Sequence, residues 1–215
     1  MATIKELKKL GVKFQKRQDG EILLMSVPKT WTGVFEVPNG VTIIHFGAFV
    51  GCQAEEIIMS NSVTEIGGCV FEHCENLKKV TFSNNLKSIQ EWCFSDCKNL
   101  QKVIIPESVE RIEGFAFCNC ENLQKVIISK NLKYIDKNAF YKCKALKEII
   151  TDDDHFDENL REYKNEPWFK LLKNTKVYVP KTNLNSIKED SNKGEKKEFM
   201  KHLKEKVDEF YKNQR

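Results

Sequence analysis

Apolar positions recur along this chain with a period of about 23 residues, within the range of known repeat proteins. In each unit, an apolar Leu-x-x-Val-x-Ile stretch precedes a Val-x-x-Ile step and a small residue followed by Phe-x-x-Cys. The last step occurs at Phe49/Cys52, Phe71/Cys74, Phe94/Cys97, Phe117/Cys120 and Phe140/Cys143. The Val or Ile that follows it recurs at a constant spacing, at Ile57, Val80, Val103, Val126 and Ile149. A fixed period of this size predicts a solenoid, in which each unit buries its apolar face against its neighbours.

The apolar positions also predict the strands of the solenoid. Side chains alternate along a strand, so the first and third residues of each short apolar run face the core and the middle one faces solvent. Strands are predicted at Phe35/Val37, Ile57/Met59, Val80/Phe82, Val103/Ile105, Val126/Ile128, Ile149/Thr151 and Val177/Val179. Stacked in parallel, they give a sheet of about seven rungs. The opposite wall is predicted at Val63/Ile66, Leu86/Ile89, Val109/Ile112 and Leu132/Ile135, with the Phe column between the walls.

Residues 1–34 differ from the repeats and are predicted to cap the solenoid, which then occupies residues 35–180. Ile4, Leu7 and Leu10 have helical spacing, and Thr3 precedes them as a potential N-cap. Apolar and polar residues then alternate around a tight turn at Asp19-Gly20, which predicts a hairpin. A cap is required because the end of a solenoid otherwise exposes its core.

The C-terminal part has another pattern. Residues 181–194 are polar and aperiodic, which predicts a linker, and residues 195–215 are predicted to form an amphipathic helix with Phe199, Leu203, Val207 and Phe210 on one stripe. We consider three roles for this helix: packing on the solenoid, self-association or partner binding, and attachment to a membrane surface.

Composition narrows the classes of function. The formal charge of +4 is too small to indicate nucleic acid, and the lysines lack the aromatic platform of a single-strand-binding surface. No apolar run approaches the roughly 20 residues of a transmembrane helix, and Met1–Leu10 lacks the apolar stretch of a signal peptide. We therefore expect a cytoplasmic protein, with the cell surface as the alternative.

Eight cysteines raise the question of disulfides or metal ligands. Five occupy one column of the repeat, and an odd column cannot pair completely, so we predict buried, reduced thiols. The groups Cys69-x3-His73-Cys74 and Cys118-x-Cys120 do not match the ligand spacing of a zinc finger. The carboxylates of residues 152–158 lack the glycine and spacing of an EF-hand loop. We assign no metal site, no cofactor site and no catalytic residue, and we predict a protein that is not an enzyme.

The solvent-facing positions of the strands are the candidate site for a protein partner. The middle strand residues form one column, and the residues before the strands form another, which consists of Glu56, Lys79, Lys102, Lys125 and Glu148. The predicted binding residues are Ile58, Lys79, Thr81, Lys102, Ile104, Lys125, Ile127, Ile150 and Tyr178. Contiguous exposed apolar surface tends to mark a binding site. The competing interpretation is that isoleucine is present because it favours strands.

The segment Asn-Leu-Gln-Lys-Val-Ile-Ile-Pro-Glu-Ser-Val-Glu-Arg-Ile-Glu-Gly-Phe-Ala-Phe-Cys-Asn-Cys, residues 99–120, closely resembles the BspA-like, Treponema-type leucine-rich repeats. The resemblance covers residues 35–180, and residues 176–181, Lys-Val-Tyr-Val-Pro-Lys, resemble the closing rung of that family. It implies a right-handed leucine-rich repeat coil that binds proteins through its concave sheet. Many members are surface proteins of bacteria and protozoan parasites, so the resemblance also implies an adhesin or host-ligand receptor as an alternative.

Overall fold

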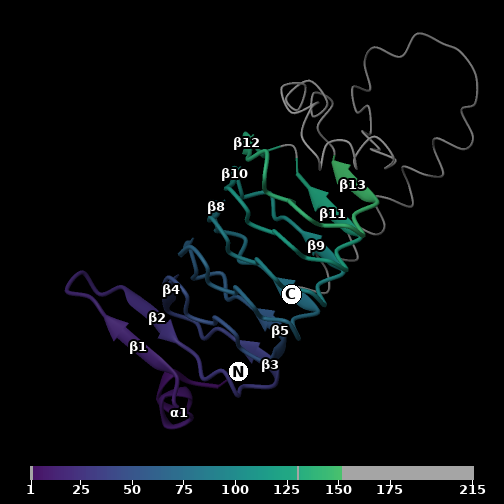
Figure 1. Cartoon of the computed structure of the whole chain (residues 1–215). Helices are drawn as coiled ribbons and strands as arrows, with labels where there is room; N and C mark the ends of the chain where they lie inside the picture. The colour runs from purple at the N-terminus through teal and green to yellow at the C-terminus, as the bar shows by residue number, and fades with distance from the viewer. Residues whose placement is uncertain (1, 130, 152–215) are drawn as a thin grey trace, which may run out of the picture. The chain divides into compact units, whose positions relative to one another are not determined.

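The computed structural model describes residues 2–129 and 131–151, which form a coil of stacked rungs (Figure 1). One wall consists of short parallel strands: β3 (Gly33–Glu36), β5 (Ala54–Ile58) and β7 (Lys79–Thr81) pair in order, as do β9 (Lys102–Ile104), β11 (Lys125–Ile128) and β13 (Glu148–Thr151). In register, Ile57 lies between Phe35 and Val80, and Val126 lies between Val103 and Ile149. Six predicted rungs are confirmed. The seventh, Val177/Val179, lies outside the described residues.

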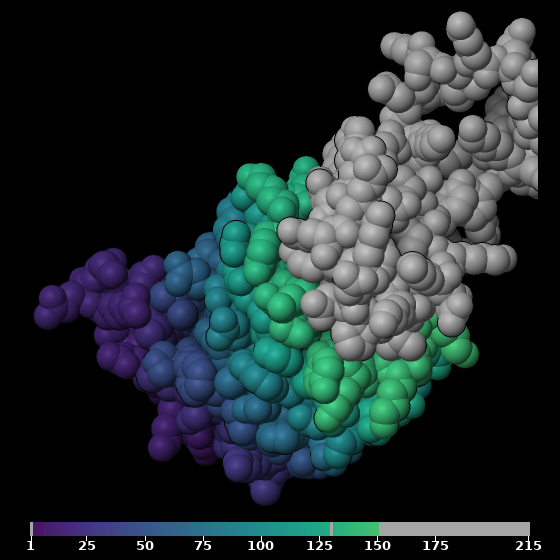
Figure 2. Space-filling model, turned by 45° about the horizontal axis from the view of Figure 1, so that its top comes forward, coloured from purple at the N-terminus to yellow at the C-terminus, as the bar shows by residue number. Residues whose placement is uncertain are grey.

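The opposite wall also follows the prediction. Its strands are β4 (Val41–Ile44), β6 (Glu65–Ile66), β8 (Ser88–Ile89), β10 (Arg111–Ile112) and β12 (Tyr134–Ile135). They pair in parallel in the groups β4–β6 and β8–β10–β12. In the space-filling view, the rungs follow one another as bands from the purple N-terminal residues to the green residues before 152 (Figure 2).

A helix and a hairpin precede the first rung, as the sequence predicts. The helix α1 (Ile4–Lys9) begins with a capping box, in which the Thr3 hydroxyl accepts the Glu6 N–H and the Glu6 carboxylate accepts the Thr3 N–H. Strands β1 (Lys13–Lys16) and β2 (Ile22–Ser26) form an antiparallel hairpin. Strand β2 also pairs in parallel with β4, so the hairpin continues the opposite wall, which the sequence pattern did not predict.

A column of phenylalanine rings fills the core between the walls. The rings of Phe71, Phe94, Phe117 and Phe140 stack with centroid separations of 4.9, 5.2 and 5.4 Å. Towards the N-terminus, the column runs through Phe49 to Phe35, a residue of strand β3, and all six side chains are fully buried. The rings of Phe71, Phe94 and Phe117 therefore each pack against the ring of the rung before and the ring of the rung after, so a solenoid unit is stabilised by its neighbours.

The turns between the opposite wall and the sheet form a third side of the coil. Their backbones are hydrogen-bonded between rungs: the Phe71 N–H donates to the Cys93 carbonyl at 2.8 Å, and the Phe94 N–H donates to the Ala116 carbonyl at 2.7 Å. Left-handed backbone recurs at two positions of these turns, although the turn that contains Phe140 has it at only one of them. One is the position directly before the cysteine of Phe-x-x-Cys, which holds Gly51, His73, Asp96, Asn119 and Lys142. The other lies two residues before the Phe and is left-handed at Gly47, Cys69, Trp92 and Phe115. Gly, Asn, Asp and His tolerate this conformation best, whereas Trp and Phe rarely adopt it.

The predicted linker at residues 181–194 and helix at residues 195–215 lie outside the described residues. The boundary at residue 180 and the acidic segment at 152–158 do as well.

Candidate functional site

The predicted middle column lies on the solvent side of the sheet. Ile104, Ile127 and Ile150 stand directly opposite one another on β9, β11 and β13, and Ile58 stands opposite Thr81 on β5 and β7. All five side chains are partly exposed, whereas the flanking Val and Ile positions of these strands are buried. Figure 1 shows these strands along one wall. Tyr178, the last predicted member, lies outside the described residues.

The lysine column beside it is not a run of uncompensated positive charge. The Lys79 ammonium lies 2.6 Å from the Glu56 carboxylate of the preceding rung, and the Lys125 ammonium lies 2.9 Å from the Glu148 carboxylate of the next rung. Lys102 lies between them, in register with Lys125, and is exposed. The prediction of a lysine stripe did not include these pairs, although each Glu stands one repeat away from its Lys in the same column.

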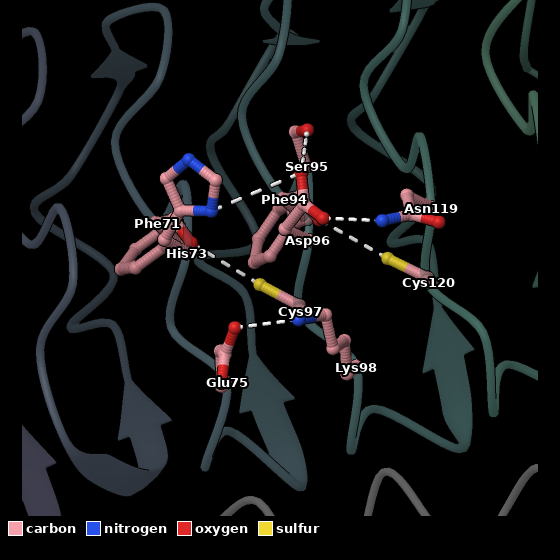
Figure 3. Close-up of polar contacts among 10 residues, drawn as sticks. All are labelled: Phe71, His73, Glu75, Phe94, Ser95, Asp96, Cys97, Lys98, Asn119 and Cys120. Carbon is pink, nitrogen blue, oxygen red and sulfur yellow. Dashed lines mark hydrogen bonds and ion pairs between the residues drawn. The ribbon is translucent and has the colours of Figure 1, made fainter.

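The same one-repeat relation pairs charges in other columns. The pairs are Lys78–Glu55, Lys98–Glu75, Lys133–Glu110 and Lys144–Glu121, with N···O distances of 2.7, 2.7, 2.7 and 3.5 Å. Figure 3 shows Lys98 reaching back to Glu75. Exposed ion pairs contribute only about 0–1 kcal/mol each. These pairs leave little uncompensated charge at the positions they occupy.

The repeated cysteine is a hydrogen-bond donor inside the coil. The thiols of Cys74, Cys97, Cys120 and Cys143 donate to the carbonyls of Phe49, Phe71, Phe94 and Phe117, each in the preceding rung, at 2.9–3.1 Å. Figure 3 shows the contact from Cys97 to Phe71. All eight cysteines are unbridged, and all except Cys69 are buried, so the five cysteines of the column are buried as predicted.

Burial makes four of the cysteine thiols poor acids. It raises the pKa of Cys74 to about 12 and raises the pKa of Cys93, Cys97 and Cys120 well above the ordinary value. A thiolate is the reactive form of cysteine, so the column is suited to structure and not to nucleophilic chemistry.

We expect the stability of the protein to fall as the pH rises above about 9, because an unfolded thiol loses its proton there while the folded Cys74 keeps it up to about pH 12. In this window, each such thiol lowers the free energy of unfolding by about 1.4 kcal/mol for every pH unit. The measurement is the melting temperature between about pH 8 and pH 11. Cys74→Ser keeps a donor for Phe49 without a titrating thiol and should lose stability less steeply. Equal slopes for both proteins would contradict the explanation.

Asp96 is the centre of a polar cluster on the turn side (Figure 3). Its carboxylate accepts hydrogen bonds from the Ser95 hydroxyl and the Asn119 amide, and the Nδ1 atom of His73 lies 3.8 Å away. Ser95 is buried and donates to Asp96 rather than to the imidazole. This is not the geometry of a nucleophile activated by a base. The cluster joins three successive rungs and orders their left-handed turns.

Among the described residues, no group of three or more His, Cys, Asp or Glu side chains is arranged to hold a metal ion. Cys74, which the sequence places in the Cys69-x3-His73-Cys74 group, directs its thiol to the Phe49 carbonyl.

None of the helices in residues 2–129 and 131–151 is long and apolar enough to span a bilayer.

Comparisons with known proteins agree with this geometry. The model of the BspA type leucine rich repeat region matches residues 33–147 in six copies. The chain is similar in structure to a leucine rich cell surface protein from Faecalibacterium prausnitzii, with 30% identity and a TM-score of 0.65, over 72% of this chain and 40% of that chain. It thus spans about two fifths of the length of that protein.

Two further solved structures support the fold alone. The T. pallidum leucine rich repeat protein has 23% identity and a TM-score of 0.61, over 65% of this chain and 68% of that chain. A leucine-rich repeat protein from Bacteroides ovatus has 24% identity and a TM-score of 0.57, over 64% of this chain and 39% of that chain. No curated protein matches the chain at a significant level.

Proposed function

Because the chain belongs to the BspA-type leucine-rich repeat family, we propose that it is a non-enzymatic scaffold that binds a protein partner through the sheet face of β5, β7, β9, β11 and β13. The observation that carries the proposal is the partly exposed column of Ile104, Ile127 and Ile150, held in register on three paired strands. Exposed apolar surface that is continuous across several elements tends to be an interaction site.

The electrostatics of the face favour a contact that is apolar at its centre. Lys79 and Lys125 are compensated by glutamates of neighbouring rungs, so little net charge surrounds the isoleucines. An apolar centre with a polar, charge-paired rim is the usual organisation of a protein–protein interface. The contact set comprises Ile58, Lys79, Thr81, Lys102, Ile104, Lys125, Ile127 and Ile150, with Tyr178 as a proposed extension.

A second candidate function is that of a cell-surface adhesin or host-ligand receptor. It is favoured by the relative from F. prausnitzii, which is described as a cell surface protein and is 30% identical. Similarity to that relative favours a location at the cell surface over the cytoplasmic location expected from the sequence. Self-association through residues 195–215 is a further proposal, distinct from both.

Affinity capture with the full chain, followed by mass spectrometry, tests the scaffold proposal, and fractionation of the untagged protein separates the two locations. We expect a protein partner that is retained in stoichiometric amount. Recovery of the chain at the outer surface would favour the adhesin. A chain that captures only further copies of itself would contradict both and would indicate self-association.

A further inference from the structure

Trp92 lies on the turn side of the coil, where its indole ring is only partly covered. One face of the ring stacks on Phe115, with ring centroids 4.4 Å apart and an interplanar angle of 11°. In the preceding rung, the equivalent position holds Cys69, whose short side chain cannot cover an indole. Trp92 remains 37% exposed, and it adopts the left-handed backbone that bulky residues rarely adopt.

Phe46 presents a second exposed ring near the same place. It is 63% exposed, and two of its ring carbons lie 3.5 and 3.6 Å from the point where a Cβ atom on Gly68 would stand. Gly68 precedes Cys69, so the Phe46 ring lies beside the rung that precedes the rung of Trp92. The rungs of Phe46 and Trp92 are separated by one rung, or about 10 Å of stacking. Two exposed aromatic residues therefore flank the small residues Gly68 and Cys69.

The same place carries carboxylates without a lysine from a neighbouring rung. The positions one repeat before and one repeat after Glu91 are Gly68 and Gly114, so Glu91 has no counterpart for the ion pairs seen in other columns. Among the described residues, no ion pair involves its side chain. Burial is the first cause that raises the pKa of the Cys69 thiol, and the charges of Glu72 and Glu91 add to it. Both carboxylates therefore lie near Cys69.

We propose that this surface binds a basic side chain of a partner polypeptide, with arginine as the best fit. We name it the aromatic–acidic patch, and it comprises Phe46, Gly68, Cys69, Glu72, Glu91 and Trp92. A guanidinium group stacks on aromatic faces and pairs with carboxylates, and it is less strongly hydrated than an ammonium group. The chain uses this chemistry internally, since the Arg111 guanidinium lies 4.3 Å from the centroid of the Tyr134 ring. The patch is on another side of the coil from the sheet face, so this proposal does not depend on the proposed function.

Titration of the 15N-labelled full chain with the peptide acetyl-Gly-Arg-Gly-Arg-Gly-amide at low ionic strength tests the proposal by NMR. We expect the indole N–H signal of Trp92 and the amide signals of Gly68 and Cys69 to shift and saturate. Glu91→Gln should weaken binding about threefold to fivefold, and Trp92→Leu, which keeps an apolar side chain without the aromatic face, should weaken it by a similar factor.

The matched control is Glu107→Gln, an exposed glutamate in another part of the coil, which should leave the affinity unchanged. The same peptide with Glu in place of Arg should not shift the Trp92 signal. The proposal is overturned if millimolar arginine peptide gives no saturable shift, if Glu91→Gln and Glu107→Gln weaken binding equally, or if the glutamate peptide binds as well.

Discussion

Replacing Phe117 with Ala is expected to lower the free energy of unfolding by about 3–5 kcal/mol, the range for truncating a buried phenylalanine. Phe117 is fully buried between Phe94, at 5.2 Å and 4° between ring planes, and Phe140, at 5.4 Å and 15°. Its removal leaves a cavity that touches two rungs at once. Because each rung is stabilised only by its neighbours, the loss weakens both contacts of the central unit.

Denaturant unfolding of the two proteins measures this effect as a lower midpoint at an unchanged slope. Phe46→Ala is the matched control, because it removes the same group from a side chain that is 63% exposed. It should change stability by no more than about 0.5 kcal/mol. A cost for Phe117→Ala below about 1 kcal/mol would show that the ring column is not the core of the coil.

The double substitution Ile104→Asp and Ile127→Asp is expected to abolish capture of the partner while the coil stays folded. Both side chains face solvent from paired strands, so their replacement removes contact area without opening a core cavity. Two carboxylates within an apolar contact would lose hydration without gaining partners, which costs several kcal/mol in a tight interface. The loss of two strand-favouring residues costs the fold itself only about 1 kcal/mol each.

Capture and melting temperature are measured together for this variant. The control, Thr64→Asp with Asn131→Asp, adds the same charge at two exposed positions away from the sheet. It should bind the partner as the natural chain does. A folded Ile104→Asp/Ile127→Asp variant that still captures the partner would exclude the sheet face, and one that unfolds would show that these side chains belong to the core.

The fold could be predicted in detail because stacking forces the same side chain into the same place in each rung. The columns of Phe94 and Cys97 recur in the sequence for that reason, and both are buried as predicted. The pairing of β2 with β4 could not be predicted, since residues 22–26 lack the repeat motif and form the pair only through the hairpin geometry. The left-handed backbone of Trp92 could not be predicted either, because bulky aromatic residues rarely adopt it.

The candidate site was predicted in part. Strand alternation placed Ile104 and Ile127 on the solvent side, where the structure has them. The electrostatics were missed, because the column was interpreted by its three lysines although Glu56 and Glu148 stand at its two ends. Each of these glutamates is one repeat away from the lysine that it pairs with, Lys79 and Lys125 respectively. The aromatic–acidic patch was missed as well, since Phe46 and Trp92 stand in different columns and are brought near one rung only by the stacking.

Methyl NMR of the full chain, labelled at isoleucine and titrated with the captured partner, tests the binding face most directly. We predict that the signals of Ile104, Ile127 and Ile150 shift or broaden, while those of Ile89 and Ile112 on the opposite wall stay in place. Changes confined to the opposite wall or the turn side, with the three sheet-face signals unmoved, would contradict the proposal that this chain binds its partner through the sheet.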